Sequence, residues 1–345
     1  MKKILLVSHE MSYTGAPRSL LNIAGIFIKM GFCVFVWTLK DGNFKKEFLK
    51  LGVEVRDVAD CVYQMQEEIK KFDLVILNTF FTAKLVLYMQ SLTRTILYLR
   101  EAQNIPDLAH DCDLNIEDIR SANEVICVSE YARDFIQINY SPKNISVIHN
   151  FVKDEYRRRL NIVHGGVINY MISGTVEKRK GHDIAIKAFL QMPEELQKIT
   201  RLHIVGRKPE WSRSFWEDLI PEGNERIIEH GEISDEQERL ELYEKMNVFI
   251  VASRDESCSL VALEGAMLGK ALILSENVGA KYLDVTGKSI YPTENVDVLC
   301  RKMCELTSRK KLLCKGFKMR KRYLRTSTEK KYISNIRNIV HGEII

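Results

Sequence analysis

The sequence of 345 residues predicts an α/β protein with two tandem domains, each built on an open parallel sheet. Three observations support this. The chain is longer than one hydrophobic core usually supports. Short, continuously apolar runs alternate with helix-length segments, which is typical of strands buried on both faces of a parallel sheet. The alternation stops in a charged stretch at 153–159, where we place the linker, and then starts again.

The first half begins with an apolar run at 3–8 that ends in a polar loop. Apolar residues at helical spacing follow at 19–27, so strand, loop and helix are expected in that order. The other strands expected in this half are 31–37, 53–55, 73–77, 95–99, 124–128 and a run ending at 146–150.

The second half restarts with a strand at 167–172, followed by a glycine-containing loop and a helix at 183–190. Beyond Asn295 the sequence has the pattern of helix to its end, except around Gly316. The other expected strands are 201–206, 226–228, 248–252 and 271–274. We therefore expect domains at 1–153 and 154–322 and a final helix at 323–345.

The composition is that of a globular protein, with 46% hydrophobic and 28% charged residues. No run of about 18 uncharged apolar residues exists, and the N-terminal apolar run is short, so neither a transmembrane span nor a signal peptide is expected. The eight cysteines are scattered without a C-x-x-C pair. This favours reduced thiols in the cytoplasm over a zinc site or a disulfide framework.

The net charge of +5 conceals a basic segment at 301–325, which holds 11 basic residues and one acid, Glu305. Such a segment could bind nucleic acid, an anionic membrane or a phosphorylated ligand. It could equally be a helix face that only contacts solvent. We expect its apolar side chains to face the protein, so that membrane binding would be electrostatic with little insertion. These side chains are Met303, Leu306, Leu312, Leu313 and Phe317.

Two strand-to-helix loops, 12–17 and 173–181, are rich in small residues. Free backbone N–H groups at the start of the following helix would suit an anion. Neither loop matches the dinucleotide or P-loop fingerprint. The second loop adds Lys178, Arg179 and Lys180, which suit a diphosphate, although an ordinary surface turn has the same composition.

The most informative segment is 253–270. Glu256 lies in the loop after a buried strand, and Glu264 lies about two turns into the helix that Ser257 or Ser259 would start. Glu264 interrupts an apolar run, and a buried acid needs a hydrogen-bonded partner. The residues alone allow a capping acid with a structural glutamate, or a pair that binds substrate.

The pair resembles the E-x7-E signature of family GT4, the retaining nucleotide-sugar glycosyltransferases. Further similarities to this family follow in order along nearly the whole chain: Gly15-Ala16-Pro17 with Ser19-Leu20, Val128-Ser129-Glu130, Ile148-His149-Asn150, Gly174, Lys180-Gly181, Ile204-Val205-Gly206, His230-Gly231-Glu232-Ile233 and Gly279-Ala280.

The resemblance implies the GT-B fold, with two Rossmann-like domains whose parallel sheets face each other across a cleft and C-terminal helices that return toward the N-terminal domain. It implies transfer of a sugar from a nucleotide-sugar donor, with a UDP-sugar favoured, to a saccharide, lipid-linked or protein-linked acceptor in cell-surface glycan synthesis. No cofactor, metal or nucleic acid is expected. A cytoplasmic protein, peripheral at the inner face of the membrane through 301–325, fits this function.

The resemblance also implies roles for residues. Glu256 would hold the donor sugar near its anomeric carbon, Lys180 would contact the phosphates, and Glu264 would bind the ribose diol. The donor-binding residues would be Gly15, Ala16, Arg179, Gly206, Ile233, Ser257, Cys258, Ser259, Leu260 and Glu264.

The chain departs from the family at two places. Gly174-Thr175 stands where a Gly-Arg is usual, so Arg179 is expected to supply the missing phosphate contact. Arg100 stands where a histidine is usual, so we expect Arg100 to contact donor or acceptor, and His9 is a second candidate for such a contact.

Three other functions compete with this interpretation. A nucleotide-sugar epimerase or phosphorylase would share the fold, and a nucleic-acid-binding protein would use the basic segment. Asp111-Cys112-Asp113 matches the D-x-D of metal-dependent transferases, but those enzymes have a different fold.

Overall fold

The computed structural model describes residues 2–156 and 166–341. The chain forms two compact units, the first being Met1–Asn150 with Ile333–Ile345 and the second Phe151–Tyr332. The sequence placed these divisions at 153/154 and 322/323. Of the predicted linker 153–159, residues 157–159 lie outside the described residues.

Unit 1 contains a seven-stranded parallel sheet in the order β3-β2-β1-β4-β5-β6-β7. Every residue of β4, β5 and β6 is buried, as expected for strands covered on both faces. The strands are β1 (Lys3–Ser8), β2 (Cys33–Thr38), β3 (Val55–Asp57), β4 (Leu74–Asn78), β5 (Thr95–Leu99), β6 (Val125–Cys127) and β7 (Ile145–Val147).

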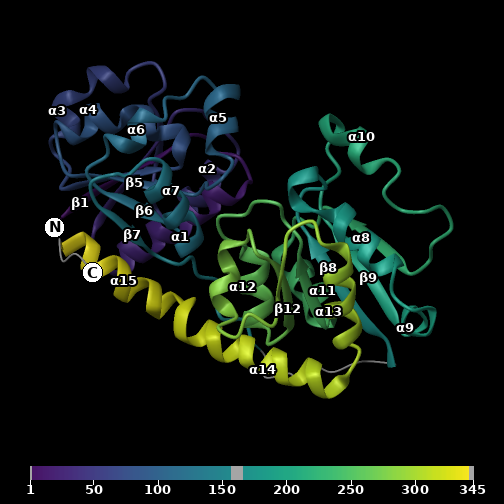
Figure 1. Cartoon of the computed structure of the whole chain (residues 1–345). Coiled ribbons are helices and arrows are strands. Elements are labelled where there is room, and N and C mark those ends of the chain that lie inside the picture. Colours follow the sequence, from purple (N-terminus) through teal and green to yellow (C-terminus); the bar gives the residue numbers. More distant parts are fainter. Residues whose placement is uncertain (1, 157–165, 342–345) are drawn as a thin grey trace. The chain divides into compact units, whose positions relative to one another are not determined.

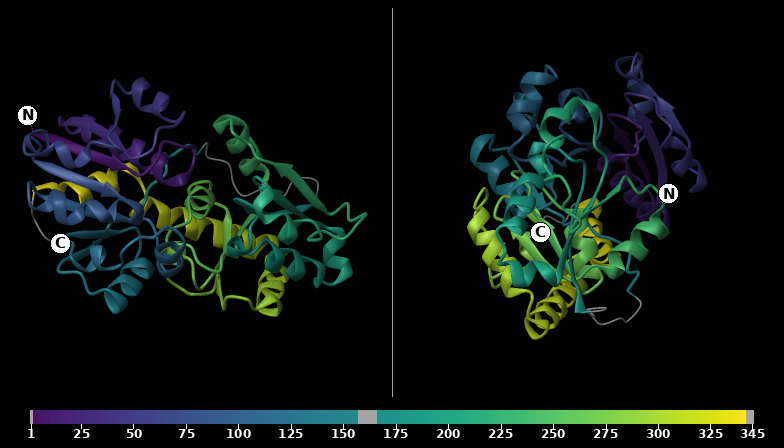
Figure 2. Two further views of the ribbon diagram at one scale, coloured as in Figure 1. Left: turned by 90° about the horizontal axis from the view of Figure 1, so that it is seen from above. Right: turned by 90° about the vertical axis from the view of Figure 1, so that its right-hand side faces the viewer.

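Helices cover both faces of this sheet (Figures 1 and 2). Those within residues 2–150 are α1 (Gly15–Lys29), α2 (Lys45–Lys50), α3 (Gln66–Ile69), α4 (Val86–Gln90), α5 (Ile105–Asp111), α6 (Glu117–Arg120) and α7 (Glu130–Asn139). The end of α15 (Glu329–His341) also belongs to this unit, and Arg94 Nη2 donates to its Ile339 carbonyl at 2.8 Å.

Unit 2 contains a six-stranded parallel sheet in the order β10-β9-β8-β11-β12-β13. Its strands are β8 (Ile168–Ser173), β9 (Thr200–Val205), β10 (Ile227–Gly231), β11 (Val248–Val251), β12 (Ala271–Ser275) and β13 (Ile290–Tyr291). Its helices within the described residues are α8 (His182–Leu190), α9 (Glu194–Lys198), α10 (Arg213–Trp216), α11 (Glu236–Lys245), α12 (Leu260–Met267), α13 (Val296–Glu305) and α14 (Arg309–Thr326).

The sheet of unit 2 separates two hydrophobic cores. Tyr170 packs with residues of α8 and α13, whereas its neighbour Met171 packs with residues of α11, α12 and α14. Successive strand residues point to opposite faces, so each group of helices covers one face of the sheet. Figure 2 shows helices on both sides of these strands.

In both sheets the strand order reverses next to the first strand, and the loop that follows this strand lies at that point. The first strand lies between the second and the fourth strand of its sheet, β2-β1-β4 in unit 1 and β9-β8-β11 in unit 2. In open α/β sheets, ligands bind outside the carboxyl ends of the strands at such a switch. The loops after β1 and β8 are the two that the sequence singled out.

The predicted α/β class with two parallel sheets is confirmed, and three details are corrected. The two-residue strand β13 was missed because so short a run carries no pattern. The C-terminal helices break at 306–308 and 327–328, not at Gly316, which is buried inside α14. Leu313 and Phe317 do not face the protein, since their exposed fractions are 43% and 71%.

No helix within residues 2–156 and 166–341 has the length and apolarity needed to cross a membrane.

Candidate active site

The loop after β8 is held by close backbone contacts that only glycine allows. Gly181 has a φ of +71° and precedes α8, and a Cβ built on it would lie 2.1 Å from the carbonyl oxygen of Ala252. A Cβ on Gly206, at the end of β9, would lie 1.8 Å from the carbonyl oxygen of Gly174. The loops after β8, β9 and β11 therefore touch at the carboxyl edge of the sheet.

Lys180 and Glu256 form an ion pair at this edge. Both side chains are mostly buried, and Ser253 Oγ also donates to Glu256 Oε2, at 3.0 Å. The backbone of Glu256 is fixed by two hydrogen bonds, from its N–H to the Asn277 carbonyl at 3.0 Å and from the Gly279 N–H to its carbonyl at 2.7 Å. The structure thus brings together the two residues expected to be catalytic.

Arg179 lies next to this pair but is engaged by other groups. Its Nη2 is 2.6 Å from Glu177 Oε1, and its Nη1 donates to the Asp255 carbonyl at 3.2 Å. Its backbone carbonyl accepts from the Arg254 N–H at 2.8 Å. The guanidinium therefore links the loop after β8 to the loop that carries Glu256.

Arg254, which sequence analysis did not identify, connects two parts of the site through ion pairs. Its Nη2 is 2.8 Å from Asp183 Oδ2 in the first turn of α8, and it also pairs with Glu294. The hydrogen bonds that Arg254 donates to the Asp183 carboxylate are the main reason that the pKa of Arg254 lies above its usual range. This ion pair fixes the start of α8 relative to the loop before α12.

The N-terminus of α12 follows Glu256 directly. Ser259 is its N-cap, and the Ser259 hydroxyl accepts from the Ala262 N–H at 3.3 Å. Ser257, Cys258 and Ser259 connect Glu256 to Leu260, the first residue of the helix, and Cys258 and Ser259 are buried. The positive end of the helix dipole thus lies beside the ion pair.

Glu264 has a charged partner in Arg239 of α11, with Nη2 and Oε1 3.2 Å apart. Burial lowers the pKa of Arg239, but attraction to Glu264 and other groups outweighs it, so the pKa lies above its usual value. Tyr243, one turn further along α11, shares a hydrogen bond of 2.7 Å with Ser173 at the end of β8. Arg239 lies in a highly charged helix, where nothing in the sequence distinguishes it from its neighbours.

Two histidines stack beside the expected base-binding loop. Their rings lie 15° from parallel, and His203 Nδ1 is 2.9 Å from His230 Nε2. His203 Nε2 is also 3.2 Å from Asn169 Oδ1, an acceptor, so we assign the proton of His203 to Nε2 and let His230 donate to Nδ1. Ile233, three residues after His230, is half-buried against the same core as Tyr243.

We expect this pair to make stability depend on pH. Burial is the main cause that lowers the pKa of His203 from 6.5 to about 4. As pH falls below 6.5, His203 is protonated in the unfolded chain but stays neutral in the folded protein. The free energy of unfolding therefore decreases until about pH 4, where His203 is protonated in the folded protein too. The loss is at most about 3 kcal/mol.

Urea unfolding at pH 7.5, 6.0 and 5.0 measures this effect. His182, whose pKa burial also lowers to about 4, contributes in the same direction. The variant His203→Gln should therefore lose less stability than the wild type between pH 7.5 and 5.0. An equal loss in both proteins would contradict the assignment.

In unit 1, His9 and the loop after β1 form a polar cluster. His9 Nδ1 is 3.1 Å from Thr79 Oγ1, and its ring stacks on Phe81 at 4.8 Å. Burial is the main cause that lowers the pKa of His9. Glu10 accepts from the hydroxyls of Ser12 and Thr14 and so shapes the loop before α1.

Gly15 and Ala16 begin α1 at this loop. A Cβ on Gly15 would meet no atom within 4 Å, so the backbone there is open to an approaching group. The Ala16 carbonyl accepts from Asn78 Nδ2 at 3.4 Å. Asn78 ends β4 and also binds Arg100, which connects this loop to the next one.

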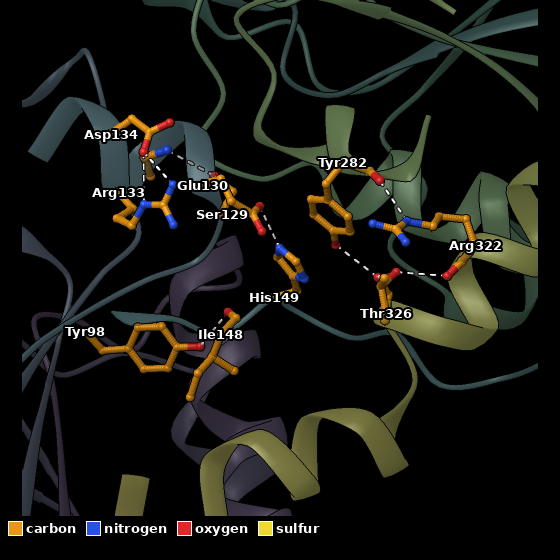
Figure 3. A network of polar contacts seen from close by, with 12 residues as sticks. Tyr98, Ser129, Glu130, Arg133, Asp134, Ile148, His149, Tyr282, Arg322 and Thr326 are labelled. Atoms are coloured by element: carbon orange, nitrogen blue, oxygen red, sulfur yellow. Dashed lines mark hydrogen bonds and ion pairs between the residues drawn. The ribbon is translucent and has the colours of Figure 1, made fainter. Parts of the chain in front are cut away.

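Arg100 is held firmly at the carboxyl edge of the unit 1 sheet. Its Nε donates to Asn78 Oδ1 at 3.0 Å and its Nη1 to Asn150 Oδ1 at 2.7 Å. The guanidinium lies 3.9 Å above the ring centre of Tyr98, whose hydroxyl donates to the Ile148 carbonyl at 3.3 Å (Figure 3). Buried Glu101 accepts from the Arg100 N–H at 2.9 Å.

A further contact joins the loops after β6 and β7. Figure 3 shows His149 pointing at Glu130, with Nε2 and Oε2 2.8 Å apart. Glu130 begins α7, whose N-cap Ser129 accepts from the Ala132 N–H at 3.1 Å. Both strand ends that resembled the family are thus tied together by polar side chains.

Neither the D-x-D motif nor the pocket beside α10 coincides with these residues. Asp111 and Asp113 are exposed, and within the described ranges no three His, Cys, Asp or Glu side chains gather as a metal site. A pocket of about 410 Å³ contains none of the residues expected to bind the donor. It is lined by Lys208, Trp216, Glu217, Ile220, Pro221, Glu222, Gly223, Asn224, Glu225 and Glu229.

Solved structures share the fold of the whole chain. HepE of Anabaena in complex with UDP and glucose has a TM-score of 0.82 at 16% identity, covering 99% of this chain and 100% of that one. Sucrose-phosphate synthase of Thermosynechococcus elongatus gives 0.75 at 15%, covering 99% of each chain. The lipopolysaccharide outer core galactosyltransferase WaaB gives 0.76 at 15%, with the same coverage. The predicted GT-B fold is confirmed.

Family models match both units. The model of "Glycosyl transferases group 1" matches residues 168–309, and that of "Glycosyl-transferase family 4" matches residues 1–103. No curated protein matches the sequence significantly. The matched ranges contain Lys180, Glu256 and Glu264 in unit 2 and His9, Gly15 and Arg100 in unit 1. The chain therefore belongs to the group 1, family 4 glycosyltransferases and is a glycosyltransferase.

Proposed function

We propose that this glycosyltransferase moves a sugar, with retention at the anomeric carbon, from a UDP-sugar to a saccharide, lipid-linked or protein-linked acceptor in cell-surface glycan synthesis. The Lys180–Glu256 pair beside the N-terminus of α12 is the observation that carries the proposal. The UDP and glucose bound by HepE support the donor class, and the lipopolysaccharide role in the name of WaaB supports the acceptor class.

The charges at this edge of the sheet support the following proposed chemistry. The bond from the anomeric carbon to the β-phosphate breaks, and the bond to the acceptor oxygen forms on the same face. Lys180 and the N–H groups of 257–260 stabilise the charge on the leaving UDP, and a phosphate oxygen takes the acceptor proton. Glu256 holds the sugar hydroxyls. Arg179 supports the phosphates through the position of its loop.

Glu264 is assigned to the ribose diol and Arg239 to the position of Glu264. Arg239 Nη2 pairs with Oε1 of Glu264, so the two side chains hold each other in place beside the expected ribose position. Arg239 thus orients this carboxylate through a charge-assisted contact. It is a positioning residue for the donor.

Arg239→Ala should therefore raise the donor KM about tenfold and change kcat little, because the lost contact orients the ribose and not the reacting atoms. Arg239→Lys should restore part of the affinity. Arg213→Ala, which removes an exposed arginine that pairs with Glu210 and Glu217, is the matched control. A fall in kcat with an unchanged KM would contradict the assignment.

Unit 1 supplies the proposed acceptor-side residues. His9 and Arg100 end in polar networks at the carboxyl edge of its sheet. Arg100 takes the place of the usual histidine and contacts donor or acceptor oxygens through its guanidinium. Gly15 and Ala16 offer open backbone to the donor.

We propose that the reaction needs no metal, because Lys180 and the start of α12 supply the positive charge that a metal would otherwise provide. Added EDTA should leave the transfer rate unchanged within about twofold. Activity that EDTA abolishes and Mn²⁺ or Mg²⁺ restores would contradict this proposal and return attention to Asp111 and Asp113.

Thermal stabilisation by UDP-, GDP- and ADP-sugars tests the donor class, since a ligand that binds only the folded state raises its Tm. The UDP-sugar should give the largest shift, and UDP should be released only when an acceptor glycan is present. Epimerised sugar without acceptor, or phosphorolysis, would favour one of the alternative enzymes. We place the protein in the cytoplasm, with 301–325 in peripheral contact with the inner face of the membrane.

A further inference from the structure

The outer face of α14 carries a stripe of exposed apolar side chains. Leu313, Phe317 and Leu324 have exposed fractions of 43%, 71% and 50%. Their spacing of four and seven residues puts them in one row along the helix. The inner face is formed by the buried residues Leu312, Gly316, Met319 and Tyr323. The helix thus has apolar side chains outside its buried face as well, on the side where a surface helix normally presents polar groups to water.

Cations border this stripe. At 100° per residue, five basic side chains fall on the same outer half of the helix, and all five are exposed. They are Lys310, Lys311, Lys318, Lys321 and Arg325. Among the residues that the structure describes, none of the five forms an ion pair, and α14 itself contains no acid. The charge is therefore available to a partner.

The helix is anchored so that this face is held outward. Arg320 pairs with Asp154 at 2.7 Å and donates to the Met267 carbonyl, and Arg322 Nε donates to the Tyr282 carbonyl at 2.9 Å (Figure 3). The Tyr323 hydroxyl donates to the Val152 carbonyl at 2.9 Å. Figure 1 shows α14, in yellow, along the outside of unit 2 next to α12 and β12.

We propose that the outer face of α14 docks on an anionic lipid surface, with Phe317, Leu313 and Leu324 inserted among the acyl chains and the five cations on lipid phosphates. An apolar stripe with a group of cations along one side fits a helix that lies in a membrane interface. Nucleic acid would satisfy the cations but would leave the three apolar side chains without a partner. The inference extends the membrane contact of the proposed function and rests on it.

Flotation with vesicles tests the proposal on the full chain. Wild-type protein should bind vesicles of phosphatidylcholine with about one third phosphatidylglycerol at about 0.1 M salt, and bind weakly at about 0.5 M salt. Phe317→Ser should lower the partition coefficient about tenfold, and Lys318→Gln with Lys321→Gln by a similar factor. The control Ile138→Ser removes an equally exposed apolar side chain on α7 and should change nothing.

Insertion has its own readout. In Phe317→Trp, the added fluorescence should shift to the blue with anionic vesicles and be quenched by brominated acyl chains. Equal binding of Phe317→Ser and wild type, equal binding to neutral vesicles, or retention on DNA without vesicle binding would each overturn the proposal. Phe317→Ser should keep wild-type Tm and wild-type transfer to a water-soluble acceptor, so loss of lipid binding and loss of catalysis can be told apart.

Discussion

Glu256→Gln should lower kcat of sugar transfer by about 10²- to 10³-fold while the protein stays folded. The amide keeps the size of the side chain but not the charge that, in the proposed mechanism, faces the sugar hydroxyls and the developing positive charge at the anomeric carbon. The backbone hydrogen bonds of Glu256 to Asn277 and Gly279 do not depend on the carboxylate, so the loop should hold its shape. Steady-state kinetics with the best donor of the thermal panel, together with Tm, measures both effects.

The neighbouring acid provides a matched control. Asp255→Asn removes a carboxylate one residue away in the same loop, and it leaves in place the backbone carbonyl that accepts from Arg179. This variant should keep kcat within about threefold of the wild type. Wild-type turnover by Glu256→Gln, or an equal loss in both variants, would remove Glu256 from the mechanism.

The fold was predictable because its signal is local. Buried parallel strands are continuous apolar runs, and such a run at 74–78 or 248–251 is recognisable without any knowledge of its neighbours. The exposure of Leu313 and Phe317 was not predictable in this way. Leu312 is fully buried, whereas the next residue, Leu313, is exposed, because neighbouring residues of a helix point in different directions.

The site was predictable only in part for a related reason. Glu256 and Lys180 stand in loops whose sequences resemble a family motif, so both could be named from the sequence. Arg239, Arg254 and His203 act through partners 25, 71 and 34 residues away in Glu264, Asp183 and Asn169. A contact between residues that far apart depends on the packing of the sheet, and a single sequence does not record it.

The second large effect is expected for Lys180→Ala, which should lower kcat/KM by about 10- to 100-fold, corresponding to the loss of about 1.5 to 3 kcal/mol from a charged contact. Both the donor KM and kcat should change, because in the proposed mechanism Lys180 faces the phosphates of the bound donor and stabilises their charge as UDP leaves. The Glu256 carboxylate contacts Lys180 and Ser253. Removal of the Lys180 ammonium leaves the contact with Ser253 in place, and the carboxylate becomes less well oriented.

A variant of the nearby Lys178 tests whether Lys180 acts through direct contact with the phosphates or only through its positive charge. Lys178 lies on the same short turn but is exposed, so Lys178→Ala should lower kcat/KM less than about threefold, an effect that about 0.3 M salt should erase. Thr175→Ala should leave the kinetics unchanged if Arg179 and its loop have replaced the usual arginine. Loss of activity in Thr175→Ala as large as in Lys180→Ala would show that the phosphates are held at Thr175 instead. Equal losses in Lys178→Ala and Lys180→Ala would show that Lys180 contributes only its positive charge and not a specific contact.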